Sequence, residues 1–316
     1  MSCSDGGSAC AKGEAVAGTF EPVAVLGLGA MGRRLARRTL AAGIPTIVWN
    51  RHREATRELV AAGAEVADTA ADAALRAGIV VTMVSDAEAV GSIAREQGLL
   101  AALRPDAIWA QMSSIGVAAT DTLADLVRTE RRDVTFIDAP VVGSPELAEQ
   151  GELLILASGP QAARARLNPV LNAVGRTLWV GPVGTGTRLK VVHNTWLAFA
   201  AEAVVASLAV ARRLGLPTEA VMNLFADNPA ASPWQLAKLQ RVSRHEYEPQ
   251  FRLSLALNDV RLAQQVTDED QFVALAGLAE EWQRAADRGL GDEDLTVVHR
   301  TLEPAATVRP GTAIRI

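Results

Sequence analysis

The chain has 316 residues, a formal net charge of −5, 49% hydrophobic residues and 21% charged residues. This length allows two medium domains with buried cores, and the composition excludes disorder over most of the chain. The acidic balance, without a long basic block, excludes the charge pattern expected for binding to nucleic acid or to an anionic membrane surface. We therefore expect a small-molecule partner.

Both cysteines, Cys3 and Cys10, lie in a leader that is rich in Gly, Ala and Ser. The leader has neither an arginine-rich start nor a continuous apolar segment, so we predict a disordered leader over residues 1–19. Two peripheral cysteines are too few for a disulfide framework or a metal site, which favours a cytoplasmic protein without a bound metal. Because no stretch of about 18 residues is apolar and free of charge, a membrane-spanning helix is not expected.

From residue 20 onward, short apolar runs alternate with amphipathic helical segments. Strands are expected at 23–27, 45–50, 79–84, 107–111 and 134–138, with helices at 30–42 and from residue 53 onward. This alternation predicts a parallel, doubly wound sheet. Two further strands, at 153–157 and 177–180, flank a helix at 161–174 and extend the α/β pattern to about residue 181.

An alanine-rich helical pattern then runs from Gly184 to about Leu214, where Gly215 and Pro217 end it. The rest of the chain reads as helices. The sequence thus predicts a Rossmann-type domain over residues 20–182. A long interdomain helix and an all-α substrate and dimerisation domain are expected over 183–316. The alanine-rich helix, together with Trp196, favours a homodimer.

A glycine-rich motif follows the first predicted strand directly and opens the first predicted helix. Its glycines permit a tight turn and close approach of a pyrophosphate, which the helix N-terminus binds. The predicted cofactor residues here are Gly27, Leu28, Gly29, Ala30, Met31 and Gly32. Val84 and Ser85, at the end of the strand at 79–84, are also assigned to cofactor binding.

The end of the second predicted strand indicates which dinucleotide binds. NAD-binding sites carry an acidic residue there, whereas this chain has Asn50, Arg51 and, two residues later, Arg53. A carboxylate would repel a 2′-phosphate, but asparagine and guanidinium groups bind one through charge-assisted hydrogen bonds. The sequence therefore predicts NADP(H). The alternative for the arginines is a solvated helix start.

Lys190 and Asn194 are four residues apart near the start of the long helix, so they share one helical face. A lysine in an apolar cleft loses hydration, its pKa falls, and it can then exchange a proton with a reacting oxygen. His193 lies beside them. Spacing alone leaves a surface lysine as the alternative.

Four motifs in order resemble the β-hydroxyacid dehydrogenases, which include 3-hydroxyisobutyrate dehydrogenase and the glyoxylate/succinic semialdehyde reductases. They are Gly27–Gly32, Asp138–Ser144 with Gly151–Leu153, Gly184–Asn194, and Asp259 within Phe251–Ala263. The resemblance covers nearly everything after the leader. It implies that Lys190 protonates the substrate carbonyl during hydride transfer and that Asn194 helps to hold the substrate.

The same resemblance assigns further contacts. It places Ser113 near the nicotinamide, and it places the loop formed by Val142, Gly143 and Ser144 against the substrate. His193 and Trp196 complete the predicted substrate-binding set.

Two departures from the family pattern concern the substrate. Many members have serine where this chain has Val142, so a hydroxyl that would contact a substrate carboxylate is missing. Asn258 stands before Asp259 where the family usually has lysine, which removes a cationic contact.

The sequence favours an NADPH-dependent reductase of a small aldehyde or keto substrate. Two alternatives remain open. One is an imine reductase, which Val142 supports and Lys190 disfavours, because that class usually has Asp or Tyr at the lysine position. The other is a non-catalytic NADP-binding interaction module, against which Lys190 and Asn194 both count.

Overall fold

A computed structural model describes residues 20–268 and 270–302. The leader predicted over residues 1–19 lies outside these ranges, as do residues 303–316 of the predicted second domain.

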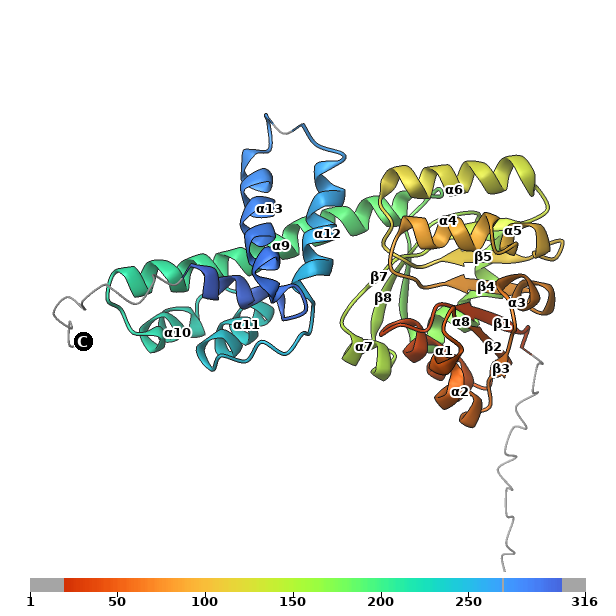
Figure 1. Ribbon diagram of the computed structural model, residues 1–316, viewed down its shortest axis with the longest axis horizontal. Coiled ribbons are helices and arrows are strands. Elements are labelled where there is room, and N and C mark those ends of the chain that lie inside the picture. Colours follow the sequence, from red (N-terminus) through yellow and green to blue (C-terminus); the bar gives the residue numbers. More distant parts are fainter. Residues whose placement is uncertain (1–19, 269, 303–316) are drawn as a thin grey trace, which may run out of the picture.

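The N-terminal half is built on a six-stranded sheet in which every strand is parallel to its neighbours (Figure 1). Its strand order places β1 and β4 at the centre. In spatial order the strands are β3 (Glu65–Val66), β2 (Thr46–Trp49), β1 (Val23–Leu26), β4 (Ile79–Thr82), β5 (Ile108–Gln111) and β6 (Thr135–Asp138). This is the doubly wound Rossmann arrangement that the sequence predicted, and its ligand crevice lies at the carboxyl ends of the strands.

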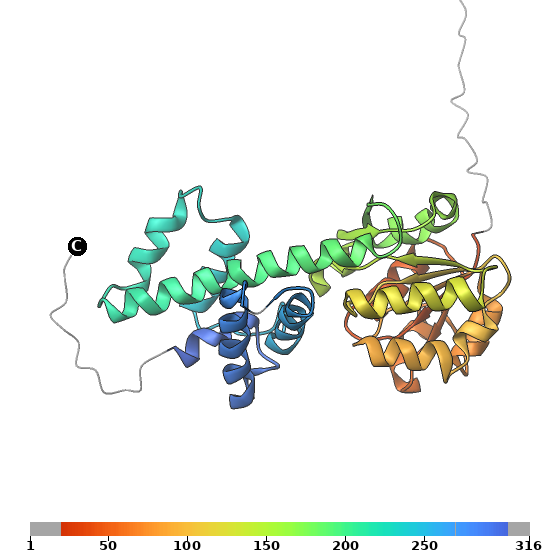
Figure 2. The same ribbon diagram turned by 90° about the horizontal axis from the view of Figure 1, so that it is seen from above.

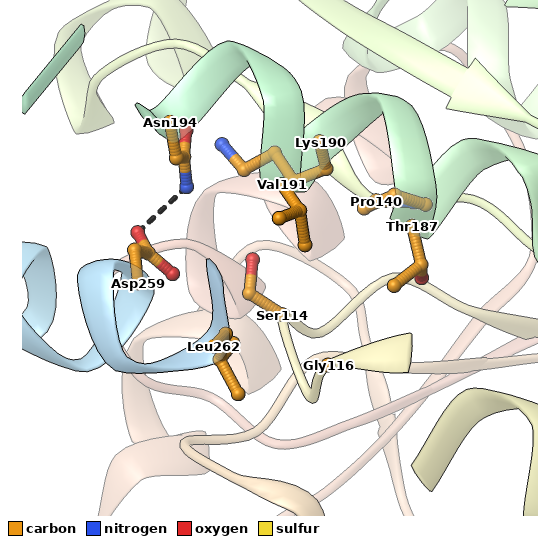
Figure 3. A pocket seen from close by; sticks show the side chains of 9 residues that line it. All are labelled: Ser114, Gly116, Pro140, Thr187, Lys190, Val191, Asn194, Asp259 and Leu262. Carbon is orange, nitrogen blue, oxygen red and sulfur yellow. Dashed lines mark hydrogen bonds between the residues drawn. The ribbon is translucent and has the colours of Figure 1, made fainter. Parts of the chain in front are cut away.

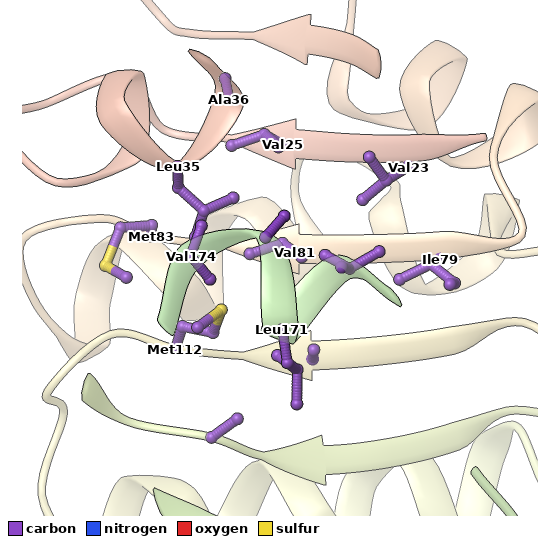
Figure 4. Packing of buried hydrophobic residues seen from close by; sticks show 14 of the residues in the cluster. Val23, Val25, Leu35, Ala36, Ile79, Val81, Met83, Met112, Leu171 and Val174 are labelled. Atoms are coloured by element: carbon purple, nitrogen blue, oxygen red, sulfur yellow. The ribbon is translucent and has the colours of Figure 1, made fainter. Parts of the chain in front are cut away.

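Helices cover both faces of this sheet, because successive side chains of each strand point to opposite faces and both sets are apolar. Val23 and Val25 belong to one buried cluster, and Ala24 and Leu26 to the other. One face is covered by α1 (Gly32–Ala41), α2 (Arg57–Ala61), α7 (Pro145–Gln150) and α8 (Arg164–Val174), and Figure 4 shows part of its packing. The other is covered by α3 (Ala70–Arg76), α4 (Ala87–Arg95), α5 (Leu99–Ala102) and α6 (Val117–Glu130).

The strands predicted at 153–157 and 177–180 do not extend the main sheet. They form β8 (Leu153–Ala157) and β9 (Gly175–Trp179) of a separate three-stranded sheet. Its third strand, β7 (Val141–Val142), pairs antiparallel to β8 and was not predicted. A two-residue strand is too short to give a periodic apolar pattern, so only its pairing partner reveals it.

The second half of the chain is helical, as predicted. Its helices are α9 (Thr185–Arg213), α10 (Thr218–Ala226), α11 (Pro233–Ser243), α12 (Leu253–Gln264) and α13 (Val273–Ala285). Short 3₁₀ or π turns occupy Arg53–Thr56, Gln161–Ala163, Ala286–Leu290 and Leu295–Thr301.

Helix α9 connects the two halves and contributes to both (Figure 2). Its first turn lies against the sheets, and farther along it Val205 and Leu208 pack in the core of the helical half. By length and composition alone α9 could cross a membrane, with an 18-residue window of mean hydropathy 1.5 that is 39% buried. The core helix of a globular fold passes the same test.

Candidate active site

The glycine-rich loop between β1 and α1 has the geometry of a phosphate cradle. Gly27 has φ +96°, and a Cβ on Gly32 would lie 1.9 Å from the carbonyl oxygen of Gly27, so both positions require glycine. A Cβ on Gly29 would meet nothing within 4 Å, which leaves open space above the loop. Within the described residues, no acceptor is found for the amides of Gly29, Ala30 and Met31. Free amides at a helix N-terminus suit a pyrophosphate.

The residues after β2 separate into two groups. Asn50 braces the loop, since its Oδ1 accepts a hydrogen bond of 2.9 Å from the Leu28 amide. Arg51 is exposed and forms no ion pair with any residue in 20–268 or 270–302. Arg53 is also exposed, but its guanidinium pairs with Asp68 at 2.7 Å. Of the two arginines, Arg51 has the cation available to a ligand.

Ser113 is buried, with 1% of its surface exposed. Its hydroxyl accepts a hydrogen bond of 2.8 Å from the Val84 amide and thereby ties the ends of β4 and β5 together. Val84 packs against Gly27, and the exposed Ser85 bonds Asp86, which caps α4. Ser114, which follows Ser113 in the sequence, lines a pocket beside Lys190.

Lys190, Asn194 and Asp259 meet between α9 and α12 (Figure 3). The Asn194 amide donates a hydrogen bond of 2.7 Å to Asp259 Oδ2, and its oxygen lies 2.9 Å from His193 Nδ1. Because the amide nitrogen faces a carboxylate, the oxygen accepts and His193 carries its proton on Nδ1. Asn194 is thereby fixed from both sides.

Burial and mutual attraction set the protonation of this cluster. Burial lowers the pKa of Lys190 below its usual 10.5, and the nearby Asp259 carboxylate opposes that shift. Burial raises the pKa of Asp259 to about 6, against the effects of Lys190 and of the Asn194 hydrogen bond. The pKa of His193 is lowered, chiefly by burial. An amine with a lowered pKa beside a carboxylate exchanges a proton with a ligand more readily than a fully hydrated lysine does.

The pocket around Lys190 is small and of mixed character, and the space within and just outside it, part of it open solvent, is about 260 Å³. It lies between the two halves of the chain. Its lining residues are Ser114, Gly116, Pro140, Thr187, Lys190, Val191, Asn194, Asp259 and Leu262. Three apolar side chains, of Pro140, Val191 and Leu262, form its walls beside the polar groups.

The other predicted substrate residues lie outside this pocket lining. Val142 is partly buried in β7, Gly143 is exposed with φ +139°, and Ser144 caps α7. Trp196 points to solvent and is 79% exposed. The structure brings together Lys190 and Asn194, which the sequence paired by spacing.

Seven of the nine lining residues were absent from the predicted site, among them Asp259, Ser114 and Leu262. Asp259 was noted only as part of a family motif, and the hydroxyl next to Ser113, that of Ser114, was not considered. Leu262 closes the pocket against Gly116, whose added Cβ would lie 2.7 Å from a Leu262 methyl group. The spacing from Asp259 to Leu262 on one helix face could have suggested the leucine.

Comparisons with known proteins agree with this geometry. Residues 22–183 match the NAD-binding domain of 6-phosphogluconate dehydrogenase, and residues 184–302 match the NAD-binding domain of NADP-dependent 3-hydroxyisobutyrate dehydrogenase. The chain belongs to the β-hydroxyacid dehydrogenase family. Like its relatives, this family member is an NAD(P)-dependent oxidoreductase.

Individual relatives resemble the chain over most of its length. An uncharacterized oxidoreductase of Bacillus subtilis, YfjR, is 32% identical over 86% of this chain and 96% of its own. Glyoxylate/succinic semialdehyde reductase 1 of Arabidopsis thaliana is 28% identical over 87% of this chain and 96% of its own. Among solved structures, a 3-hydroxyisobutyrate dehydrogenase from Salmonella typhimurium is 26% identical, with a TM-score of 0.76 over 89% of this chain and 99% of its own.

The raised pKa of Asp259 predicts a pH-dependent stability. The folded state binds this proton more tightly than the unfolded state, whose carboxyl has the usual pKa of 3.8. The proton on Asp259 therefore contributes its full stabilisation to the free energy of unfolding below about pH 4, and this stabilisation is lost as the pH rises through about 6. We expect the unaltered chain to lose stability relative to Asp259→Asn over that range, measured by urea denaturation at several pH values. Asp125→Asn, in an exposed pair on α6, is the control. If the free energy of unfolding depends on pH in the same way for the unaltered chain and for Asp259→Asn, the raised pKa of Asp259 is contradicted.

Proposed function

We propose that this family member is an NADPH-dependent reductase of small aldehyde or keto compounds, in which Lys190 is the general acid. The observation that carries the proposal is the partly buried Lys190 amine beside Asp259, in a pocket that also holds Asn194 and Ser114. A bound dihydronicotinamide supplies the hydride. The chain supplies position and a proton.

Within this proposal, Lys190, Asp259 and Asn194 have separate tasks. Lys190 donates its proton to the carbonyl oxygen as negative charge develops there. Asp259 keeps the amine protonated, since a nearby carboxylate favours the cationic form. Asn194, whose side chain is held by His193, fixes the Asp259 carboxylate by a hydrogen bond and borders the substrate.

The cofactor would be held along the carboxyl edge of the main sheet. Within the described residues, the amides of Gly29 and Ala30 have no acceptor and suit the pyrophosphate, and Arg51, which forms no ion pair there, lies beside Asn50 and suits a 2′-phosphate. Arg53 contributes less, because it is already paired with Asp68. This distribution of charge favours NADPH over NADH.

The substrate loop favours less polar substrates than hydroxyacids. Val142 offers no hydrogen-bond donor, and an unmet buried acceptor costs about 1–3 kcal/mol. The Ser144 hydroxyl accepts a hydrogen bond of 3.5 Å from the Leu147 amide as the cap of α7, which leaves its proton and the backbone amides of the loop to replace the missing donor. The named relatives include a glyoxylate/succinic semialdehyde reductase, which supports a small aldehyde as substrate.

An imine reductase is the second candidate, and Val142 is the observation that favours it. A cyclic imine carries no carboxylate and would not need a donor at this position. NADPH oxidation with matched panels of aldehydes, keto acids and cyclic imines would distinguish the candidates. Turnover of none of them would instead favour a non-catalytic NADP-binding module.

We further propose a cytoplasmic homodimer. Exposed apolar side chains recur along one side of α9, at Leu189, Val192, Trp196 and Phe199. They lead to Ala203 on the same helix, which lines a mainly apolar groove of about 420 Å³ against α10 and α11. A second copy of the chain would cover this continuous strip.

Lys190→Ala should lower kcat by about 10²–10⁴-fold, the usual contribution of a general acid. NADPH affinity should change little, because the phosphate-binding loop lies on a different element. Single-turnover kinetics and a fluorescence titration of NADPH would measure the two effects separately. Full activity in the alanine variant would exclude Lys190 as the proton donor.

Arg51→Ala should weaken NADPH binding by roughly 10–100-fold, the loss expected for one charge-assisted contact, and leave NADH binding nearly unchanged. Asn50→Asp should go further and reverse the cofactor preference, since its carboxylate repels a 2′-phosphate. Arg53→Ala, which removes an arginine already paired, is the comparison variant and should have a smaller effect. Titrations that give equal affinities for both cofactors in the unaltered protein would refute the NADPH preference.

Trp196→Glu should convert the dimer to a monomer at micromolar concentration, as measured by light scattering, because it places a charge in the centre of the apolar strip. The matched control is Val273→Glu on α13, where an apolar residue that is 70% exposed lies outside the strip. A monomeric mass for the unaltered protein would refute the dimer.

A further inference from the structure

A buried carboxylate lies at the carboxyl end of β6, outside the set of residues used above. Asp138 is 0% exposed. Its Oδ2 accepts hydrogen bonds from the Thr187 amide at 2.8 Å and the Ser158 hydroxyl at 3.0 Å, and its Oδ1 accepts one from the Thr187 hydroxyl at 2.6 Å. No ion pair to Asp138 exists within residues 20–268 and 270–302. All of its partners are neutral groups, and two of the three belong to the first turn of α9.

Helix α9 starts without a cap of its own. The residue before it, Gly184, is left-handed at φ +87° and has no side chain with which to accept the first amides. The amide of Gly186 instead donates to the Ser158 hydroxyl at 3.0 Å, and the amide of Thr187 donates to Asp138. First-turn amides need acceptors, which the helix's own N-cap residue usually supplies. Here the acceptors come from the ends of β6 and β8.

The first turn of α9 is also pressed closely onto the sheets. A Cβ on Gly186 would lie 2.1 Å from the carbonyl oxygen of Leu156 and 3.1 Å from Asp138 Oδ2. Lys190 is four residues beyond Gly186, so it projects from the same helix face one turn later. A shift or rotation at this turn would therefore be passed on to the Lys190 amine.

We propose that Asp138 is a positioning residue for the reaction: it clamps the first turn of α9 to the main sheet and thereby fixes where the Lys190 amine lies. The inference rests on the proposed role of Lys190. Charge-assisted hydrogen bonds are shorter and stronger than neutral ones, which is consistent with the 2.6 and 2.8 Å distances to Thr187. Burial raises the pKa of Asp138, and the hydrogen bonds from Thr187 and Ser158 and the charge of Arg188 oppose that shift. A buried carboxylate without a directly paired cation is costly, and the positive end of the helix dipole offsets part of that cost.

A double-mutant cycle tests this inference. Asp138→Ala should lower kcat by about 10–100-fold, the effect expected when a catalytic group is displaced by about 1 Å. In the Lys190→Ala background, the same substitution should change the residual kcat by less than about 3-fold, because the group it positions is already absent. The affinity for NADPH should remain within about 2-fold in both backgrounds, because the clamp holds α9 and not the phosphate-binding loop.

Asp138→Asn is the conservative variant. Its amide oxygen can accept from the Thr187 amide and the Ser158 hydroxyl, while its amide nitrogen donates to Thr187 Oγ1. That hydroxyl can turn its own proton to Thr120 Oγ1, 3.2 Å away. All bonds of the clamp are then kept, so kcat should recover most of the loss.

Asp121→Ala is the matched control. It removes an exposed ion pair between α6 and Arg188 of α9 but leaves the first-turn amides untouched. Its kcat should stay close to that of the unaltered protein, because exposed ion pairs contribute little. If Asp138→Ala does not fold, Ser158→Ala replaces it in the cycle with the same expected non-additivity, since it removes the acceptor for Gly186 and one donor to Asp138 but leaves both bonds from Thr187.

The outcomes separate the two proposals. Full activity in Lys190→Ala would refute the proposed function, and the positioning role with it. A second outcome is that Lys190→Ala loses activity and that Asp138→Ala lowers kcat by the same factor whether or not Lys190 is present. This outcome would overturn the positioning role alone. In that case Asp138 would be a stabilising residue that does not act through Lys190.

Discussion

The structure depends most on the place where α9 begins. One helix carries Lys190 in its second turn and the core residues of the helical half farther along, so its start sets the position of both. That start has no local cap and is held instead by Asp138 and Ser158, from the ends of two strands. Asp138 ends β6 of the parallel main sheet, and the carboxyl edge of that sheet is also where a dinucleotide binds. The chain thereby brings the lysine to the same edge as the cofactor site.

Electrostatic balance inside the pocket follows from that arrangement. Burial lowers the pKa of Lys190 and raises that of Asp259, since both groups lose hydration. Placed together, each stabilises the charged form of the other. Asn194 adds a hydrogen bond to the carboxylate and is itself held by His193. The result is a polar cluster that can exchange a proton, set beside the apolar walls of the pocket between the two halves.

The pocket is closed by a contact between segments far apart in sequence. Gly116, at the start of α6, lies against Leu262 of α12, and no larger residue fits at Gly116 without moving that leucine. The apolar walls and the few polar groups together resemble the usual composition of small-molecule sites. In the proposed function, affinity for the cofactor and chemistry at the substrate belong to different elements that meet at this interface.

The sequence by itself determined those features that depend on local spacing. Alternating apolar segments gave the doubly wound sheet, the glycine pattern at 27–32 located the turn before α1, and the four-residue spacing of Lys190 and Asn194 put them on one face. Only the tertiary structure decided the contacts across long sequence separations. It set Asp259 against Asn194, 65 positions away, turned Ser114 rather than Ser113 toward the pocket, and engaged Arg53 with Asp68. It also separated β7, β8 and β9 into their own sheet. Periodicity reports which face of an element is buried, but the partner that covers that face depends on packing of the whole chain.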